Sequence, residues 1–415
     1  MHIRTVMPVT RNSRKFLKHL AAACVMGSVA LSAQAFDSPS DGVRSDSIDW
    51  GVLMDLSGTA AGQQVPWVRG IQAYMRKVNE AGGVNGRKIN LLIEDDRYDA
   101  SRVRINFEKL ANQTPVLGMS GFGSTSAQVA LMPTIRRGKV PVVGTFAITR
   151  AGVEPATPMY YNGYCGFKQM AQVGTGFFVE RLKLKAPKVV TVHMDVAGGK
   201  EYADYVATEV AKYGGTSTAL PIAVGAADAT SQVQAIIAMK PDFVTVYGVP
   251  TPTILLMRTM HQYGLTIPTF SITQLGTPNI YSALTPEIGG NLYSMSCLTP
   301  GDITDAGPGV KEMATLADKY GYGEYKSNVN YVGGWVVGQM VTESIARIGA
   351  EPTRAKLVES MDKGFEVDTK GVSSPIKFTR DDHRGMLSLR PYSYDYATKS
   401  YKAYGQYSDF EKYIK

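Results

Sequence analysis

The stretch Gly70–Asp96, GIQAYMRKVNEAGGVNGRKINLLIEDD, holds the signals of a helix, a turn and a strand in direct succession. The helix begins upstream near Trp67 and runs to Asn79, and Gly82-Gly83 ends it. Lys88 to Glu94 then has the apolar content of a strand. The apolar residues of the helix recur at a spacing that places them on one face: Trp67, Ile71, Tyr74, Met75 and Val78. A helix that leads directly into a strand is typical of a parallel α/β sheet.

The same alternation extends on both sides of this stretch. A strand at Ile48–Leu56 precedes it. Behind it follow a helix with Val103, Phe107 and Leu110 on one face, a strand at Val116–Met119, a helix from about Ser124 and a strand at Val140–Val143. The first part of the chain therefore predicts one complete set of βαβ units.

A second series of strands and helices begins near residue 185. It comprises strands at Lys188–His193, Asp242–Tyr247 and Thr269–Ile272, with helices at Tyr202–Tyr213, Ser231–Met239 and Thr253–Tyr263. Three further helices are expected at Val310–Tyr320, Tyr331–Ile348 and Thr353–Met361, before a Tyr-rich, strand-like tail beyond Ser374. Two series predict an α/β protein with two Rossmann-like lobes, each built on a parallel sheet.

The first 35 residues have the pattern of a cleavable signal peptide, which predicts export to the periplasm. Leu20–Leu31 is apolar but shorter than a membrane span, and Ala33-Gln34-Ala35 is a cleavage site that predicts processing after Ala35. The basic residues that precede the apolar stretch are Arg4, Arg11, Arg14, Lys15 and Lys18. An uncleaved anchor, or a lipoprotein joined at Cys24, is the alternative. Residues 36–47 are polar and are expected to form a disordered lead-in.

Composition excludes several classes of function. The chain has 44 Lys and Arg against 36 Asp and Glu, and without the five basic residues of the signal peptide the balance falls to 39 against 36, which gives no broad positive field for nucleic acid. The remaining histidines, His193, His261 and His383, form no metal-binding pair, and no CxxC, HExxH or GxSxG motif is present. We therefore expect no metal, no cofactor and no catalytic residue, so the protein is not expected to be an enzyme.

Gly121-Phe122-Gly123-Ser124 follows a strand and opens a helix, but it lacks the third glycine of a dinucleotide fingerprint and the lysine of a P-loop. The unpaired N–H groups of a helix N-terminus, with the hydroxyls of Ser124 and Thr125, can bind a carboxylate. An ordinary helix cap is the alternative. The acids Glu94-Asp95-Asp96 end a strand, and we expect them to cap the next turn or pair with Arg97 and Arg102 rather than contact a ligand.

Several segments, in order, resemble the periplasmic binding proteins of the branched-chain (hydrophobic) amino-acid ABC transporters. They are GVLMDLSG at 51–58, the stretch 70–96, PVVGTFAITR at 141–150 and AIIAMKPDFVTVYG at 235–248, and the resemblance extends over roughly Ile48 to Phe378. It implies the type I periplasmic binding fold, with a three-crossover hinge near residues 162, 296 and 385. The N-terminal lobe would hold residues 47–162 and 297–385, and the C-terminal lobe residues 163–296 and 386–415.

The resemblance also implies a function. Such a protein captures a small molecule in the cleft between its lobes and delivers it to ABC permease and ATPase subunits in the inner membrane. A periplasmic ligand sensor that partners a membrane receptor or kinase is the alternative, since the sequence barely separates the two. The chain is expected to be a monomer that binds no nucleic acid.

Binding residues carry over from the family by position. The resemblance places Ser124, next to Thr125, where the family's serine binds a ligand carboxylate, and Phe146, Ala147 and Thr149 where a carbonyl and a hydroxyl hold an ammonium. Ser57, in the turn Ser57-Gly58, is a further candidate to bind the ligand, and Gln63 falls where the family tends to have an aromatic wall. Further candidates to line the cleft are the aromatic residues Trp67, Phe146, Tyr164 and Tyr247, with the helix core as the alternative place for Trp67.

Two departures from the family bear on the ligand. The family has an acid in the second lobe that neutralises an ammonium, and this chain has Gln274 at that position. The family also has a Tyr-Gly turn where this chain has Gly198-Gly199, so the aromatic lid is missing. An ammonium buried without a counter-charge binds poorly. The sequence therefore favours an aromatic or aliphatic carboxylate, or a neutral polar compound, over a free amino acid. Cys165 and Cys297 lie just past two of the implied crossovers, so they form either a disulfide or two separate buried thiols.

Overall fold

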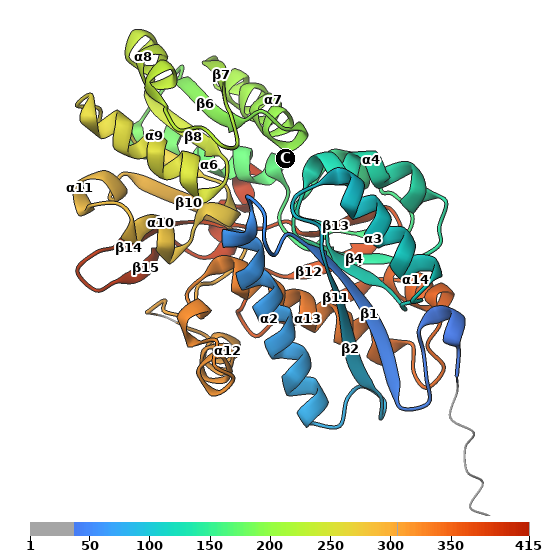
Figure 1. Ribbon diagram of the computed structural model, residues 1–415. Helices are drawn as coiled ribbons and strands as arrows, with labels where there is room; N and C mark the ends of the chain where they lie inside the picture. Colours follow the sequence, from blue (N-terminus) through green and yellow to red (C-terminus); the bar gives the residue numbers. More distant parts are fainter. Residues whose placement is uncertain (1–36, 305, 415) are drawn as a thin grey trace, which may run out of the picture. The chain divides into compact units, whose positions relative to one another are not determined.

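The computed structural model describes residues 37–304 and 306–414, and its two larger β-sheets are flanked by helices (Figure 1). The first sheet is fully parallel and has the strand order β2-β1-β3-β4-β5. Its strands are β1 (Ser47–Met54), β2 (Lys88–Asp95), β3 (Met119–Gly121), β4 (Val142–Thr145) and β5 (Tyr160–Tyr161). The helices between and behind them are α2 (Ala61–Glu80), α3 (Ala100–Asn112), α4 (Thr125–Arg136), α5 (Arg150–Val153), α13 (Val329–Arg347) and α14 (Arg354–Asp362). We call these elements the N-lobe.

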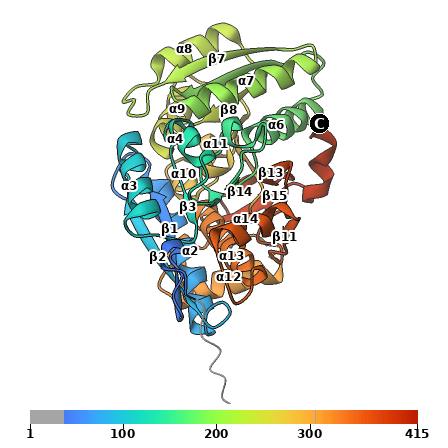
Figure 2. The same cartoon turned by 90° about the vertical axis from the view of Figure 1, so that its right-hand side faces the viewer.

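The second sheet has the order β15-β14-β10-β9-β8-β6-β7 and is parallel except for its last two strands. Its strands are β6 (Lys188–Met194), β7 (Thr216–Ile222), β8 (Phe243–Tyr247), β9 (Thr269–Ser271), β10 (Leu292–Ser296), β14 (Arg390–Asp395) and β15 (Ser400–Ala403). The principal helices with this sheet are α6 (Phe167–Leu182), α7 (Ala197–Lys212), α8 (Thr230–Met239) and α9 (Pro250–Gln262), of which α7, α8 and α9 lie together in Figure 2. We call these elements, together with the segments that connect β6 to β10, the C-lobe.

The remaining elements are short. A third, antiparallel sheet consists of β11 (Phe365–Val367), β12 (Ile376–Thr379) and β13 (Asp382–Met386). The other helices are α10 (Pro278–Ser282), α11 (Pro286–Gly289), α12 (Pro308–Lys319), η1 (Pro39–Asp41), η2 (Thr273–Leu275), η3 (Gly323–Tyr325) and η4 (Tyr407–Tyr413).

The predicted α/β class with two mostly parallel sheets is confirmed. The chain passes from the first sheet to the second after β5, returns to the N-lobe after β10 and joins the second sheet again at β14. The precise lobe boundaries near residues 162, 296 and 385 stay a prediction. The signal peptide at 1–35 and its cleavage after Ala35 lie outside the described residues. Among the described residues, the helices are too short or too polar to span a bilayer.

Residues 37–47 do not form the disordered lead-in that their polar composition predicts. Ser38 pairs with Val43, and Val43 also pairs with Ile48 at the start of β1. The Val43 side chain is fully buried, and Asp41 lies 3.7 Å from the guanidinium of Arg354. One buried valine and one ion pair therefore order a segment whose composition alone suggests a coil.

Two helices that are distant in the sequence, α2 and α13, pack with their backbones in contact (Figure 1). A Cβ built on Gly70 of α2 would lie 2.0 Å from the carbonyl oxygen of Tyr331, and one on Gly334 of α13 would lie 1.8 Å from the carbonyl oxygen of Trp67. Glycine is the residue that allows such an approach, since it has no Cβ. The crossing of α2 and α13 therefore depends on Gly70 and Gly334.

We expect Gly70→Ala to destabilise the protein by about 1–3 kcal/mol, because its methyl group would collide with the backbone of α13. Gly62→Ala is the matched control, since it lies in the same helix and has open space around it. That control should leave the protein unchanged or stabilise it by about 0.5–1 kcal/mol. Urea denaturation of both variants measures the difference. Equal stabilities for the two variants would contradict this account of the crossing.

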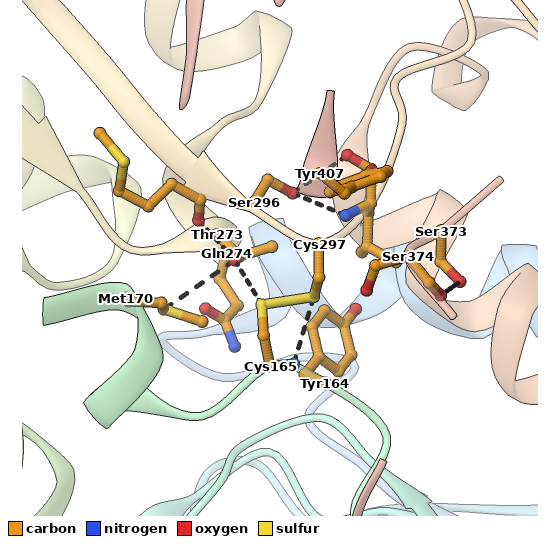
Figure 3. Close-up of a disulfide and its surroundings, with 12 residues drawn as sticks. Tyr164, Cys165, Met170, Thr273, Gln274, Ser296, Cys297, Ser373, Ser374 and Tyr407 are labelled. Atoms are coloured by element: carbon orange, nitrogen blue, oxygen red, sulfur yellow. Dashed lines mark hydrogen bonds between the residues drawn. A yellow bond between two sulfur atoms is a disulfide. The ribbon is translucent and has the colours of Figure 1, made fainter. Parts of the chain in front are cut away.

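A disulfide joins Cys165, just before α6, to Cys297, just after β10. Figure 3 shows it beside Thr273 and Gln274. The two Cα atoms lie 5.9 Å apart, within the usual range for a bridge. The Cys165 Sγ also contacts the Thr273 hydroxyl at 3.4 Å. The bond therefore ties together two of the segments through which the chain passes between the lobes.

Replacing both cysteines by serine should lower the free energy of unfolding by about 2–4 kcal/mol, because the bridge closes a long loop of the unfolded chain. Equilibrium denaturation of the oxidised protein and the double serine variant measures this loss. Treatment of the unaltered protein with a reductant should reproduce it, and the same treatment should leave the variant unchanged. A variant as stable as the oxidised protein would show that the bridge contributes nothing.

Candidate ligand-binding site

A small cavity lies between the N-lobe and the C-lobe. Its N-lobe lining is Gln63, Gln64, Tyr98, Gly123, Phe146 and Ala147, and its C-lobe lining is Phe167, Met194, Tyr247, Gly248, Val249, Ile272 and Gln274. The cavity measures about 20 Å³, which is room for about one water molecule. No Asp, Glu, Lys, Arg or His is among these described lining residues. The two lobes thus meet around a narrow, uncharged and partly aromatic space.

Side-chain amides bridge the two lobes at this cavity. The Gln63 Nε2 donates to the backbone oxygen of Gln274 at 3.1 Å, and the Gln274 Nε2 donates to the backbone oxygen of Phe146 at 3.2 Å. Asn330, in the first turn of α13, donates to the same Gln274 oxygen at 3.2 Å. A further bond across the lobes runs from the Gly198 N–H to the Thr125 hydroxyl at 3.0 Å. These contacts define a closed arrangement of the lobes.

The loop that carries Phe146 and Ala147 is fixed by a buried glutamine of α4. The Gln128 Nε2 donates to the backbone oxygens of Phe122 and Ala147 at 2.7 Å and 2.6 Å. The Gln128 Oε1 in turn accepts from the Tyr160 hydroxyl at 3.0 Å. Because every polar atom of this amide is bonded within the N-lobe, the loop can present a fixed surface to the cavity.

Two lining amides are only half satisfied. The Gln64 Oε1 accepts from the Asp55 N–H at 2.7 Å, while the Gln64 Nε2 is buried without a hydrogen-bond partner. The Gln274 Oε1 is likewise buried without a partner, although its Nε2 is bonded to Phe146. Gln64 also packs on Gly123, where a Cβ would collide with the amide. A free donor and a free acceptor therefore belong to residues that line the same cavity.

Aromatic rings form much of the wall. The rings of Phe167 and Tyr247 meet edge to face with centroids 5.1 Å apart, and those of Phe146 and Tyr164 meet at 5.8 Å. A Cβ on Gly198 would lie 2.4 Å from the Tyr247 hydroxyl. The glycine at 198 therefore makes room for Tyr247, so an aromatic residue of β8 occupies the space that a side chain at 198 would need.

Tyr98 lines the cavity because of an unusual turn after β2. Arg97 and Tyr98 have positive φ angles of 52° and 61°, which residues other than glycine seldom adopt. Two aspartates hold this conformation: Asp95 accepts from the Arg97 N–H at 3.0 Å, and Asp96 accepts from the Tyr98 N–H at 2.8 Å. Paired Asx turns of this kind explain how consecutive positive φ angles are stabilised. Sequence reasoning missed Tyr98, and the Asp-Asp pair before it was the available signal.

A buried acid of the C-lobe also escaped sequence reasoning. Glu201 of α7 accepts from the Thr149 hydroxyl at 3.3 Å and from the Arg150 N–H at 2.9 Å, both in the N-lobe. Burial raises the pKa of Glu201, and the hydrogen bond from Arg150 opposes that shift. Glu201 lines a neighbouring cavity of about 10 Å³, which shares Phe167 with the first. A C-lobe acid other than position 274 therefore contacts the predicted residue Thr149, while position 274 itself carries the neutral Gln274.

The structure brings five of the predicted site residues to the cavity: Gln63, Phe146, Ala147, Tyr247 and Gln274. The others lie elsewhere. Ser57 is exposed and donates to Asp95 at 2.6 Å. Ser124 caps α4 by accepting from the Ala127 N–H at 3.3 Å, so its hydroxyl has the role given as the alternative. Thr125 contacts Gly198.

Three more predicted residues are buried away from the cavity lining. Thr149 bonds to Glu201, as described above. Trp67 is fully buried in α2 beside the hydroxyl of Tyr164, which agrees with the helix-core alternative for Trp67. Tyr164 fills the space above Gly333 of α13. The acids at the end of β2 cap the next turn, as expected, through Asp95 and Asp96. Asp95 also lies 3.8 Å from Arg97, whereas Glu94 pairs with Lys109 at 2.7 Å.

Two α/β lobes that meet around an uncharged cavity describe a two-lobed binding protein. The model of the family named Periplasmic binding protein matches residues 47–399 of the chain. The chain belongs to this family, and it is a binding protein rather than an enzyme because the family consists of binding proteins. The resemblance found in the sequence is thereby confirmed at the level of family and fold.

Individual relatives agree with this assignment. A protein of Pseudomonas aeruginosa described as an amino acid binding protein is 26% identical over 258 residues, which are 61% of this chain and 64% of that protein. The chain thus matches less than two thirds of that relative's length. A fatty acid ABC transporter substrate-binding protein from Thermomonospora curvata has a TM-score of 0.80 and 20% identity, covering 90% of this chain and 96% of its own.

A third relative is the structure of a branched-chain amino acid ABC transporter protein from Thermus thermophilus with bound valine. Its TM-score is 0.78 and its identity 16%, over 88% of this chain and 98% of the other. At such identities the two structural likenesses establish the fold alone.

We expect the free energy of unfolding to depend on pH because of Asp96, which accepts from the Tyr98 N–H. Burial raises the pKa of Asp96 to about 7, and the neighbouring charges of Asp55, Asp95 and Asp99 add to the shift. The unfolded carboxyl titrates near pH 4, so the folded protein holds the proton more tightly. Asp96 should therefore make the unfolding free energy fall as the pH rises from about 4 to about 7.

The variant Asp96→Asn should lose this slope and be more stable than the unaltered protein at pH 8. Its amide oxygen can still accept from the Tyr98 N–H. Urea denaturation at several pH values measures the slope, and the exposed Asp46→Asn is the control that should keep it. The same slope in Asp96→Asn and in the unaltered protein would show that another group is responsible.

Proposed function

We propose that this protein is the extracytoplasmic solute-binding component of an ABC uptake transporter. It captures a small organic solute in the cleft between its lobes and presents it to permease and ATPase subunits in the inner membrane. The observation that carries this proposal is that the cavity wall comes in similar parts from both lobes. Two of the similar structures are described as ABC transporter proteins, which supports the transport role.

Closure of the lobes is the expected recognition step. Each lobe alone offers an open half-site, and a solute meets all lining residues only when both halves close around it. The bonds from Gln63 and Gln274 across the cleft, at 3.1 Å and 3.2 Å, must break for the lobes to open. Both bonds re-form when the lobes close around the solute. The same hinge motion can signal the loaded state to a membrane partner.

The wall of the cavity favours a solute with an apolar or aromatic body. Phe146, Phe167 and Tyr247 present rings, and Met194 and Ile272 add aliphatic surface. An aromatic or aliphatic carboxylate and a hydrophobic amino-acid-like compound share such a body, and the named relatives bind amino acids or fatty acids according to their descriptions. It is the body of the solute, and not its head group, that this lining supports.

We further propose that the protein works in the periplasm as a monomer, after cleavage behind Ala35. A disulfide between Cys165 and Cys297 supports this location, because such bonds persist in oxidising compartments. The family is one of periplasmic binding proteins, which agrees with it.

A screen of amino acids, aromatic acids and fatty acids by thermal shift should find a solute that raises the melting temperature, because ligand binding stabilises the folded state. Calorimetry should then show that Phe167→Ala weakens this solute at least tenfold, since the ring forms part of the wall. Tyr263→Ala removes an exposed aromatic ring and is the control that should keep the affinity. Unchanged affinity in Phe167→Ala would place the binding site elsewhere.

A further inference from the structure

The chemistry of a ligand's head group can be inferred from the two half-satisfied amides of the cavity. Gln64 and Gln274 both line it, with exposed fractions of 0% and 3%. Each has one polar atom that is buried without a partner, the Gln64 Nε2 and the Gln274 Oε1. A buried polar group without a hydrogen bond costs free energy, so a ligand that satisfies both atoms gains affinity from them.

The orientation of both amides is determined by backbone groups that can act in one way only. The Asp55 N–H can only donate, and it does so to Gln64 at 2.7 Å, so the atom of Gln64 at that contact must be the oxygen. The backbone oxygen of Phe146 can only accept, and it receives a bond from Gln274 at 3.2 Å, so the atom of Gln274 there must be the nitrogen. The atoms left over are therefore an N–H donor on Gln64 and an oxygen acceptor on Gln274.

A charged head group matches this pair poorly. A carboxylate accepts from Gln64 but has no hydrogen to offer to the Gln274 oxygen, and an ammonium has the opposite failing. Neither finds an opposite charge, because no ionisable Asp, Glu, Lys, Arg or His is among the described lining residues. Glu201 of the C-lobe, which lines the neighbouring cavity, already accepts from Thr149 and Arg150. Burial of a charge without a partner is unfavourable.

A neutral group that carries both an acceptor and a donor matches the pair. We propose, on the basis of the function proposed above, that Gln64 and Gln274 form a subsite for the carboxamide-type head group of an uncharged solute. The Gln64 Nε2 donates to the carbonyl oxygen of the ligand, and the Gln274 Oε1 accepts from its N–H. Primary amides, lactams and ureides share this chemistry. One donor comes from α2 of the N-lobe and one acceptor from η2 of the C-lobe, so such a head group joins the two lobes.

The test compares amides with the acids of the same body. Acetamide, hexanamide, benzamide and phenylacetamide are titrated calorimetrically into the exported protein at pH 7.5, each beside its carboxylate, with leucine as a separate probe. At least one amide should bind, and it should bind at least tenfold more tightly than its acid, a difference of about 1.4 kcal/mol. This comparison needs no variant and does not depend on the folding of one.

Gln64→Glu then tests the donor directly. It keeps an oxygen for the Asp55 N–H, removes the Nε2 donor and adds a negative charge, so it should weaken the amide at least tenfold and abolish its advantage over the acid. Gln113→Glu, which places the same charge on the exposed end of α3, should leave both affinities unchanged. Circular dichroism and the melting temperature show whether each variant is folded.

The possible failures are distinguishable. If an acid or leucine binds and every amide fails or binds more weakly than its acid, the protein is a solute-binding protein whose head-group subsite has been misassigned here. If no compound of this panel binds and the wider solute screen also finds none, the head-group inference and the proposed function both fail. Amide binding that Gln64→Glu leaves unchanged would overturn the assignment of the donor.

Discussion

The contact of α2 with α13 is the constraint on which the cleft depends. The two helices cross where Gly70 meets Tyr331 and Gly334 meets Trp67, without side chains between their backbones. The crossing sets where the first turns of both helices lie in space. Gln63 and Gln64 lie in the first turn of α2, and Asn330 lies in the first turn of α13. Because Gln63 and Asn330 both donate to the backbone oxygen of Gln274, two glycine positions within the N-lobe fix how that lobe meets the C-lobe.

The order of strands and helices could be predicted from the sequence because it depends on local patterns. The helix inferred from Trp67 to Asn79 lies within α2 (Ala61–Glu80), and the strand inferred at Lys88–Glu94 is β2 (Lys88–Asp95). Periodicity misses elements that are short or lack a contrast of apolar and polar residues. Strand β5 has only two residues, and α6 is buried on nearly all sides, so its sequence shows little amphipathic pattern.

The cleft was predictable only in part, because its lining depends on contacts between distant segments. Gln274 and Phe146 were found since they follow strands that the family resemblance aligns, and both line the cavity. Tyr98 was not found, because the Asp95-Asp96 pair indicates a turn but not that the turn gives Tyr98 a φ of 61° and places it at the cleft. Glu201 lies within a helix where an acid is ordinary, and only the approach of the two lobes brings it to Thr149. Ser57 does not line the cavity, and its hydroxyl donates to Asp95 instead.

The disulfide between Cys165 and Cys297 divides the protein in a way that the two sheets do not. It closes a covalent ring that contains α6 to α11 and β6 to β10, which is most of the C-lobe and its whole wall of the cavity. The N-lobe elements α2, β1 and α13 lie outside that ring. When the lobes separate, the ring can move as one clamped body, since its two ends cannot part. Any opening of the lobes must therefore move the segments at Cys165 and Cys297 together, and independent bending is left to the connections outside the ring.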